Sequence, residues 1–196
     1  MKKKLVLATR NRDKIREIKN KLGKDIDIFT IDDFDHIPEV IEDGETLEQN
    51  AIKKARIIHK YTKLPTIGDD TGLLVDALGG KPGVYSSRFA GENATYDENV
   101  DKLLDELKSV SWEQRDAKFI TVVAYMDNNS EWTVEGKVEG KIIKQKRGNN
   151  GFGYDPVFYY EKLGKTFSEM DIEEKNKISH RAIALKKFVA KYKEIN

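Results

Sequence analysis

The sequence predicts a mixed α/β protein, and three observations lead to this prediction. An apolar segment at residues 5–8 runs into an amphipathic helical pattern, and a second apolar segment follows at residues 26–31. This strand–helix–strand order is typical of a parallel βαβ unit. Later in the chain, apolar segments at residues 119–126 and 132–143 flank a polar turn at residues 127–130. Antiparallel strands are therefore expected in the second half.

The first two helices are indicated by an apolar face and by a capping pattern. Ile15, Ile18 and Leu22 lie on one face of the first helix. Residues 46–49, with the sequence Thr-Leu-Glu-Gln, match a capping box. We therefore expect the second helix to begin there and to run to about residue 60.

The remaining elements follow from similar signals. A short strand is expected at residues 65–67, followed by the polar segment 68–72 and a further apolar segment at 73–78. A second capping box at residues 95–98 opens another helix, and Ser179 is expected to cap a C-terminal helix. The inward-facing residues of these two helices are Val100, Leu103, Leu104, Leu107, Ala182, Leu185, Val189 and Tyr192.

The composition is that of one domain spanning residues 1–196. The 35 basic and 34 acidic residues nearly cancel, so no overall field indicates nucleic acid or a membrane surface as a partner. The absence of cysteine excludes disulfides, zinc–thiolate sites and thiol nucleophiles. The apolar run behind the basic residues 1–4 is too short for a signal peptide, and no transmembrane stretch is evident, so we expect a cytoplasmic protein.

The joint between the first strand and helix is a candidate phosphate site without glycine. Backbone N–H groups at a helix start bind phosphates readily. Thr9 and Asn11 could add side-chain donors, and Lys14 could add positive charge. Taken alone, however, an Asn11 helix cap and a solvated Lys14 explain this joint better.

Two further clusters of charged residues could take part in chemistry. Asp69 and Asp70 lie between apolar segments, where adjacent carboxylates suit Mg²⁺ or proton transfer, although an Asx turn would also explain them. Glu42 precedes the second helix, where acidic residues ordinarily complement the helix dipole. Lys54 falls within the apolar stripe of that helix, so it either reaches out to the surface or points into a polar cleft.

Two segments near the C-terminus could contact a ligand. Residues 151–158, with the sequence Gly-Phe-Gly-Tyr-Asp-Pro-Val-Phe, combine glycines with aromatic rings that could stack on a base. A turn leading into a core strand is the alternative, with Phe158 in the core. His180 and Arg181 stand at a helix start, where such pairs are usually surface residues but can also meet ligands.

Taken together, these segments resemble the inosine triphosphate pyrophosphatase family, whose members remove deaminated purine nucleotides. The resemblance covers nearly the whole chain and is most specific between Asp69 and Arg88. The matching segments are residues 8–14, 42–55, 68–73, 79–88, 151–158 and 179–181. Thr71 stands where many relatives have serine, which keeps the hydroxyl group.

The resemblance implies a fold, a reaction and a partner. The fold would be α/β, with an elongated mixed central sheet, flanking helices and two lobes around a substrate cleft. The enzyme would hydrolyse ITP, dITP and XTP to the monophosphate and pyrophosphate, would need Mg²⁺, and would form a homodimer.

The resemblance also implies roles for individual residues. Glu42 and Asp70 would bind Mg²⁺, and Asp70, Asp69 and Lys54 would be catalytic, with Asp70 the general base. Substrate would be bound by Thr9, Arg10, Asn11, Arg12, Asp13, Lys14, Thr71, Phe152, Gly153, Tyr154, Asp155, Lys175, His180 and Arg181. Donors on Arg181 or His180 would select the 6-oxo group of hypoxanthine and xanthine over the adenine amino group.

Three other functions are compatible with parts of the sequence. A pyrophosphatase of similar fold could prefer pyrimidine or modified nucleotides. A non-catalytic nucleotide or RNA binder could use the basic first loop, although the near-zero net charge of +1 argues against it. A purely structural α/β domain would leave Asp69, Asp70 and Lys54 without a purpose.

Overall fold

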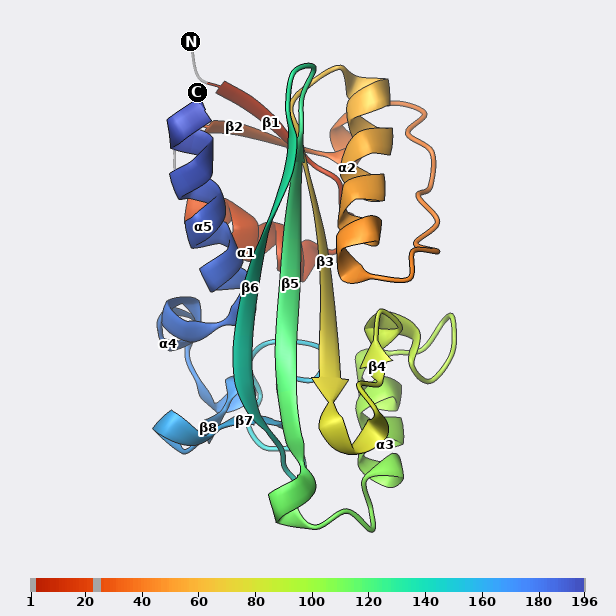
Figure 1. Cartoon of the computed structure of the whole chain (residues 1–196), viewed down its shortest axis with the longest axis vertical. Coiled ribbons are helices and arrows are strands. Elements are labelled where there is room, and N and C mark those ends of the chain that lie inside the picture. Colours follow the sequence, from red (N-terminus) through yellow and green to blue (C-terminus); the bar gives the residue numbers. More distant parts are fainter. Residues whose placement is uncertain (1–2, 23–25, 196) are drawn as a thin grey trace. The chain divides into compact units, whose positions relative to one another are not determined.

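The computed structural model describes residues 3–22 and 26–195 as a mixed sheet with flanking helices (Figure 1). This confirms the predicted α/β class. None of the helices in these residues is both long and apolar enough to cross a membrane. The strands are β1 (Lys3–Leu7), β2 (Ile26–Thr30), β3 (Thr66–Val75), β4 (Pro82–Gly83), β5 (Asp116–Met126), β6 (Glu131–Ile142), β7 (Phe158–Tyr160) and β8 (Lys165–Thr166). The α-helices are α1 (Arg12–Leu22), α2 (Leu47–Thr62), α3 (Tyr96–Glu106), α4 (Ile172–Ile178) and α5 (His180–Ile195).

The strands form one mixed sheet in the order β2-β1-β3-β5-β6-β7-β8, with β4 paired to β3. β1 pairs in parallel with both β2 and β3, whereas β6, β7 and β8 pair antiparallel. The predicted change from parallel to antiparallel strands is therefore confirmed.

The chain divides into two compact units. The first comprises Met1–Asp70, Thr121–Gly136 and Arg181–Asn196, and the second comprises Thr71–Ile120 and Lys137–His180. β3, β5 and β6 contribute residues to both units. Each unit has its own hydrophobic core.

In the first unit, helices cover both faces of the parallel strands (Figure 1). Leu5 and Leu7 of β1 pack with Ile18 of α1 and Phe188 of α5 on one face. On the other face, Val6 packs with α2. The two faces arise because successive side chains of a strand point in opposite directions.

In the second unit, α3 packs on the ends of the long strands. Its Val100 and Leu103 join Leu73 of β3, Phe119 of β5 and Phe158 of β7 in one buried cluster. The predicted placement of Phe158 in a core is confirmed.

The helix starts were predicted well, because their capping signals are local. The capping boxes at Thr46 and Thr95 are both formed, and α2 and α3 begin directly after them. The helix predicted after Ser179 is α5. The short helix α4 was not predicted, although Asp171 and Glu174 form a capping box at its start.

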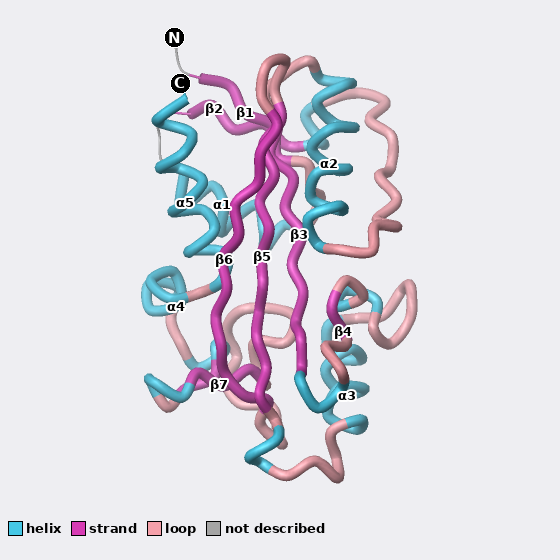
Figure 2. Tube along the Cα trace, viewed as in Figure 1, coloured by secondary structure: helices cyan, strands magenta, loops and turns pink. Residues whose placement is uncertain are grey.

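The predicted break in structure at residues 68–72 is wrong. β3 runs without interruption from Thr66 to Val75 (Figure 2), so Asp69 and Asp70 lie within a strand rather than at its end or in an Asx turn. Buried carboxylates are tolerated in a strand only when cations neutralise them. The cations that neutralise Asp69 and Asp70 lie far from them in the sequence, so the local pattern did not reveal the strand.

Gly68 allows α2 to approach β3 closely. A Cβ atom at this position would lie 2.2 Å from the carbonyl oxygen of Ala51 and 2.8 Å from the amide nitrogen of Ala55. Gly68 and Asp70 are two residues apart, so they face the same side of the strand. The missing side chain thus brings α2 against the face that carries Asp70.

We predict that Gly68→Ala lowers the free energy of unfolding by about 1–3 kcal/mol, because the new methyl group must push α2 away from β3. Urea denaturation measures this change. Gly79→Asn is a matched control: a Cβ there meets nothing within 4 Å, and asparagine tolerates the left-handed conformation (φ +62°). Equal stability of Gly68→Ala and the wild type would contradict the close approach.

Candidate active site

The candidate site is organised by two adjacent carboxylates on opposite faces of β3. Asp69 and Asp70 are both buried, with 2% and 6% of their surfaces exposed. Asp70 faces α2, where it meets Lys54 and Asn50. Asp69 faces the other side, where it meets Lys14 of α1. The closest cation therefore differs between the two carboxylates, although the charges of Lys14 and Lys54 each act on both.

On the α2 face, two carboxylates share one ammonium group. Lys54 Nζ lies 2.9 Å from Glu42 Oε2 and 3.3 Å from Asp70 Oδ1. Lys54 is only 5% exposed, so it points into a polar cluster and does not reach the surface. With two negative charges and one positive charge, this group carries a net charge of −1.

Asn50 connects this cluster to the loop that carries Glu42. Its Nδ2 donates to Asp70 Oδ2 at 3.3 Å, and its Oδ1 accepts from the amide nitrogen of Gly44 at 2.8 Å. An exposed pair between Lys53 and Asp43 (2.5 Å) also attaches this loop to α2. Glu42 is thereby held at the start of α2.

The pKa values on this face are perturbed in different directions. Burial raises the pKa of Asp70, and the charge of Glu42 adds to this effect against the opposing charges of Lys54 and Lys14. Burial also acts to raise the pKa of Glu42, but Lys54 outweighs it and the net pKa is lowered. Burial would lower the pKa of Lys54, but the surrounding carboxylates raise it. Asp70 is therefore the more basic of the two carboxylates.

On the opposite face, two cations and two carboxylates form a chain of ion pairs. Lys14 Nζ lies 3.2 Å from Asp69 Oδ2, and Arg181 donates to the same oxygen from Nε at 3.4 Å and from Nη2 at 3.3 Å. Arg181 Nη1 donates to Glu17 Oε2 at 2.6 Å. This chain links α1, β3 and α5, and its charges sum to zero.

These cations strongly favour the ionised form of Asp69. Burial would raise the pKa of Asp69, but Lys14 and Arg181 outweigh burial and lower it to about 2. The same pairing raises the pKa of Arg181, against the effect of its own burial. Asp69 is thus a fixed negative charge, in contrast to Asp70.

The joint between β1 and α1 is a capped helix start. Asn11 Oδ1 accepts from the amide nitrogens of Asp13 (3.0 Å) and Lys14 (3.1 Å), and Thr9 Oγ1 accepts from the Asn11 amide (3.1 Å). The helix-cap interpretation of Asn11 is confirmed. Lys14, by contrast, is directed to Asp69 and is not simply solvated.

The remaining polar residues of this joint lie toward solvent. Arg10 forms an exposed pair with Asp32 at 3.5 Å, Arg12 is exposed, and Asp13 pairs with Arg16 at 2.9 Å. Their assignment to substrate binding stays a prediction.

In the second unit, Asp155 organises the predicted base-binding segment. Its Oδ2 accepts from Lys175 Nζ at 2.6 Å and from the Phe152 amide at 2.9 Å. Lys175 Nζ also lies 5.0 Å from the centre of the Phe152 ring. Phe152 and Gly153 are half-buried, so both remain accessible to a ligand.

Four predicted ligand-binding residues of this unit are buried, namely Tyr154, Asp155, Lys175 and His180. Tyr154 is 5% exposed and donates its hydroxyl to the Ser86 carbonyl at 2.9 Å. The His180 ring stacks on Phe119 with centroids 4.4 Å apart. Of the two aromatic side chains considered for base stacking, Phe152 is therefore the accessible one. Thr71, the first residue of this unit, is half-buried.

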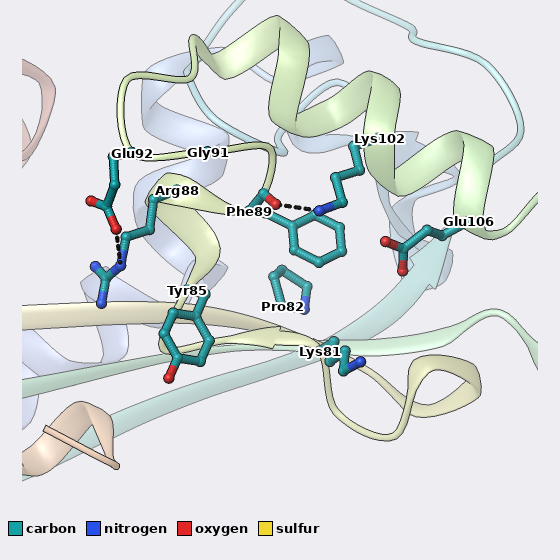
Figure 3. Close-up of a pocket in the computed structure, with 9 residues that line it drawn as sticks. All are labelled: Lys81, Pro82, Tyr85, Arg88, Phe89, Gly91, Glu92, Lys102 and Glu106. Atoms are coloured by element: carbon teal, nitrogen blue, oxygen red, sulfur yellow. Dashed lines mark hydrogen bonds and ion pairs between the residues drawn. The ribbon is translucent and has the colours of Figure 1, made fainter. Parts of the chain in front are cut away.

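A pocket of about 450 Å³ lies elsewhere in the second unit, lined in part by Pro82, Tyr85 and Phe89 (Figure 3). Lys102 of α3 donates to the Phe89 carbonyl at 2.6 Å beside it. None of the residues predicted to bind substrate or metal lines this pocket.

Comparison with known proteins agrees with the resemblance seen in the sequence. The model of the Ham1 family matches residues 5–191. The chain belongs to the Ham1 family. It is 50% identical to a dITP/XTP pyrophosphatase from Thermoanaerobacter sp. (strain X514), over 94% of this chain and 93% of the relative. It is 48% identical to the dITP/XTP pyrophosphatase of Geobacter sulfurreducens, over 92% of each chain.

Solved structures of Ham1 proteins have the same fold. A HAM1 protein from Coxiella burnetii aligns with a TM-score of 0.90 and 40% identity, over 98% of this chain and 99% of that protein. The Ham1 protein of Staphylococcus aureus aligns with a TM-score of 0.90 and 37% identity, over 99% of this chain and all of that protein.

The side chains on the α2 face fit a magnesium ion. Mg²⁺ is usually held by one or two carboxylates together with water and substrate phosphates. Glu42 and Asp70 lie close enough to contact the same ammonium group of Lys54. Across residues 3–22 and 26–195, no cluster of three or more His, Asp or Glu side chains could hold a metal ion, so a cage built entirely from protein ligands is not indicated there.

Glu17 is a site residue that the sequence analysis missed. It lies one helical turn after Lys14 and holds Arg181 from the side opposite Asp69. Its spacing of three residues from Lys14 was a usable signal, because residues at that spacing share a helix face. Its partner 164 residues away was not visible in the sequence.

We predict that Asp69→Asn lowers the free energy of unfolding by about 3–5 kcal/mol at pH 7, because it leaves buried cations without their carboxylate. The pKa of Asp69 is lowered to about 2 from its ordinary 3.8. Its stabilisation is therefore complete above pH 4 and is lost as the pH falls toward 2.

Urea denaturation between pH 7 and pH 3 should thus show that the difference in free energy of unfolding between the variant and the wild type becomes smaller as the pH falls. Asp32→Asn, in the exposed pair with Arg10, is the control and should cost less than about 1 kcal/mol. A pH-independent difference would contradict the ion-pair origin of the effect.

Proposed function

We propose that this chain hydrolyses ITP, dITP and XTP to the nucleoside monophosphate and pyrophosphate. The relatives named dITP/XTP pyrophosphatase support this function, since they are about half identical over almost the whole chain. The observation that carries the proposal is the α2 face of β3. There, Asp70 and Glu42 flank Lys54 and leave a net negative charge suited to a divalent cation.

Glu42 and Asp70 are the proposed holders of Mg²⁺. When bound, Mg²⁺ would neutralise charge that develops on the phosphate oxygens during phosphoryl transfer. Lys54, positioned between both carboxylates, would supply a further positive charge to the phosphate chain.

Asp70 is the proposed general base. Burial raises its pKa, which makes it a better proton acceptor than an ordinary aspartate. In the proposed step, water forms a bond to the α-phosphorus and gives its proton to Asp70. The bond between the α-phosphorus and the bridging oxygen breaks, and pyrophosphate leaves.

Asp69, by contrast, is proposed to position cations rather than to transfer protons. Its pKa of about 2 makes it a poor base, and one of its oxygens already contacts both Lys14 and Arg181. Lys14 would bind the phosphates, supported by the capped start of α1. Asp69 therefore serves catalysis through Lys14 and Arg181.

The second unit is proposed to recognise the base. Phe152 would stack on the purine, with Gly153, Asp155 and Lys175 shaping its surroundings. Donation to the 6-oxo group by the buried His180, or by Arg181 of the first unit, stays a prediction; this group distinguishes hypoxanthine and xanthine from adenine. A site built around such a donor discriminates against the wrong base by roughly 10⁴-fold. Homodimerisation stays a prediction from the family resemblance, and a cytoplasmic location stays a prediction from the sequence pattern.

A panel of triphosphates tests the proposed function. We expect Mg²⁺-dependent release of pyrophosphate and monophosphate from ITP, dITP and XTP, with kcat/KM far above that for ATP and GTP. Chromatography of the products distinguishes this from release of phosphate and diphosphate. A preference for pyrimidine triphosphates would favour the alternative pyrophosphatase, and salt-sensitive binding without turnover would favour a nucleotide or RNA binder.

Two substitutions test the division of roles in the first unit. We expect Asp70→Asn to lose most of kcat while nucleotide still binds, because the variant lacks the base. Lys14→Ala should instead weaken phosphate binding and raise KM. Steady-state kinetics and calorimetry with nucleotide measure both effects. Near-normal turnover of Asp70→Asn, or unchanged kinetics of Lys14→Ala, would contradict the respective assignment.

A further inference from the structure

The backbone around Phe152 is fixed by one carboxylate. Asp155 Oδ2 accepts from the Phe152 amide at 2.9 Å, and a Cβ on Gly151 would lie only 2.1 Å from the same oxygen. Asn150 is attached in turn to the Ser168 carbonyl through its amide at 3.0 Å. These contacts hold the chain, but the choice among the staggered rotamers of the Phe152 side chain also depends on what its ring touches.

Lys175 and Tyr96 both contact the Phe152 ring. Lys175 Nζ lies 5.0 Å from the ring centre, at cation–π distance. The Tyr96 ring lies 5.8 Å away at an interplanar angle of 43°, which is a tilted aromatic pair. The ammonium is itself held by Asp155 at 2.6 Å. Tyr96 is thus an aromatic neighbour that restricts the half-buried Phe152 ring.

The position of Tyr96 is set by the core of the second unit. Tyr96, Val100, Leu103 and Leu107 follow the spacing of one helix face, and the last three are fully buried. Tyr96 is the exposed end of this stripe, with 43% of its surface accessible. The capping box at Thr95 fixes the backbone directly before it. The ring is therefore presented to Phe152 from a rigid helix start.

We propose that Tyr96 is a positioning residue for base recognition, whose ring holds Phe152 in the orientation that stacks on a purine. The inference rests on the proposed function and extends it to a residue outside the segments that carry the family resemblance. A half-exposed Phe152 without this neighbour would populate several rotamers. Ordering it would then oppose nucleotide binding. Tyr96 thus lowers KM, while hydrolysis at the phosphates depends on groups of the first unit.

The test compares Tyr96→Ala with Tyr96→Phe. Tyr96→Ala removes the ring and should raise KM for ITP about 3- to 10-fold with kcat nearly unchanged, the size expected for losing an aromatic pair. Tyr96→Phe keeps the ring and should behave as the wild type. Calorimetry with IMP should show the same weakening of binding for the alanine variant alone.

A probe without a base separates positioning from general damage. Inorganic tripolyphosphate, used as a competitive inhibitor, should have the same inhibition constant for Tyr96→Ala and the wild type. Lys146→Ala is the matched control. Lys146 lies in the segment before Phe152 and forms exposed ion pairs with Asp97 (3.0 Å) and Asp101 (2.7 Å) near the start of α3. The substitution removes these ion pairs but leaves both aromatic rings in place. It should not change KM.

Several results would overturn the role of Tyr96. The first is an unchanged KM for ITP in Tyr96→Ala. The second is an equal rise in KM in Tyr96→Phe or Lys146→Ala. The third is a parallel change in the inhibition constant of tripolyphosphate in Tyr96→Ala. Absence of ITP hydrolysis by the wild type would overturn the proposed function and this role together. An active wild type with an unaffected Tyr96→Ala would overturn the role of Tyr96 alone.

Discussion

The structure of the first unit depends on neutralising two adjacent carboxylates inside a strand. An ionised carboxylate cannot be buried without a cation or hydrogen-bond donors close to it. Because Asp69 and Asp70 point to opposite faces of β3, their closest cations come from different helices, although the charges of Lys14 and Lys54 each act on both carboxylates. The helices on each face must therefore supply their own: Lys54 from α2 on one side, Lys14 and Arg181 from α1 and α5 on the other. The positions of these helices are therefore determined both by their packing on the sheet and by their ion pairs with Asp69 and Asp70.

Features with local causes could be predicted from the sequence. The caps at Thr46, Thr95 and Asn11 each need only a side chain and the next few backbone amides, so short sequence patterns reveal them. Lys54 was visible as a charge in an apolar helix face. Its two possible directions could not be separated until Asp70 and Glu42 were placed in space.

Features with distant causes could not be predicted. Residues 68–72 resemble a turn because charged residues and glycines are rare inside strands. They remain in β3 because Arg181, 112 residues away, neutralises Asp69, and because α2 requires the space left by Gly68. Likewise, the burial of Tyr154 and His180 depends on their contacts with Ser86 and Phe119, which no pattern within their own segments encodes.

The alternation of Asp69 and Asp70 also fixes the alignment of β3 with its neighbours. A shift of the strand by one residue would turn Asp70 toward α1 and α5, and Asp69 toward α2, while moving Gly68 away from the close approach of α2. The charge pattern thus specifies strand register as well as chemistry. As a consequence, inserting or deleting one residue between Ile67 and Thr71 would misalign the sheet and dismantle the site in the same event.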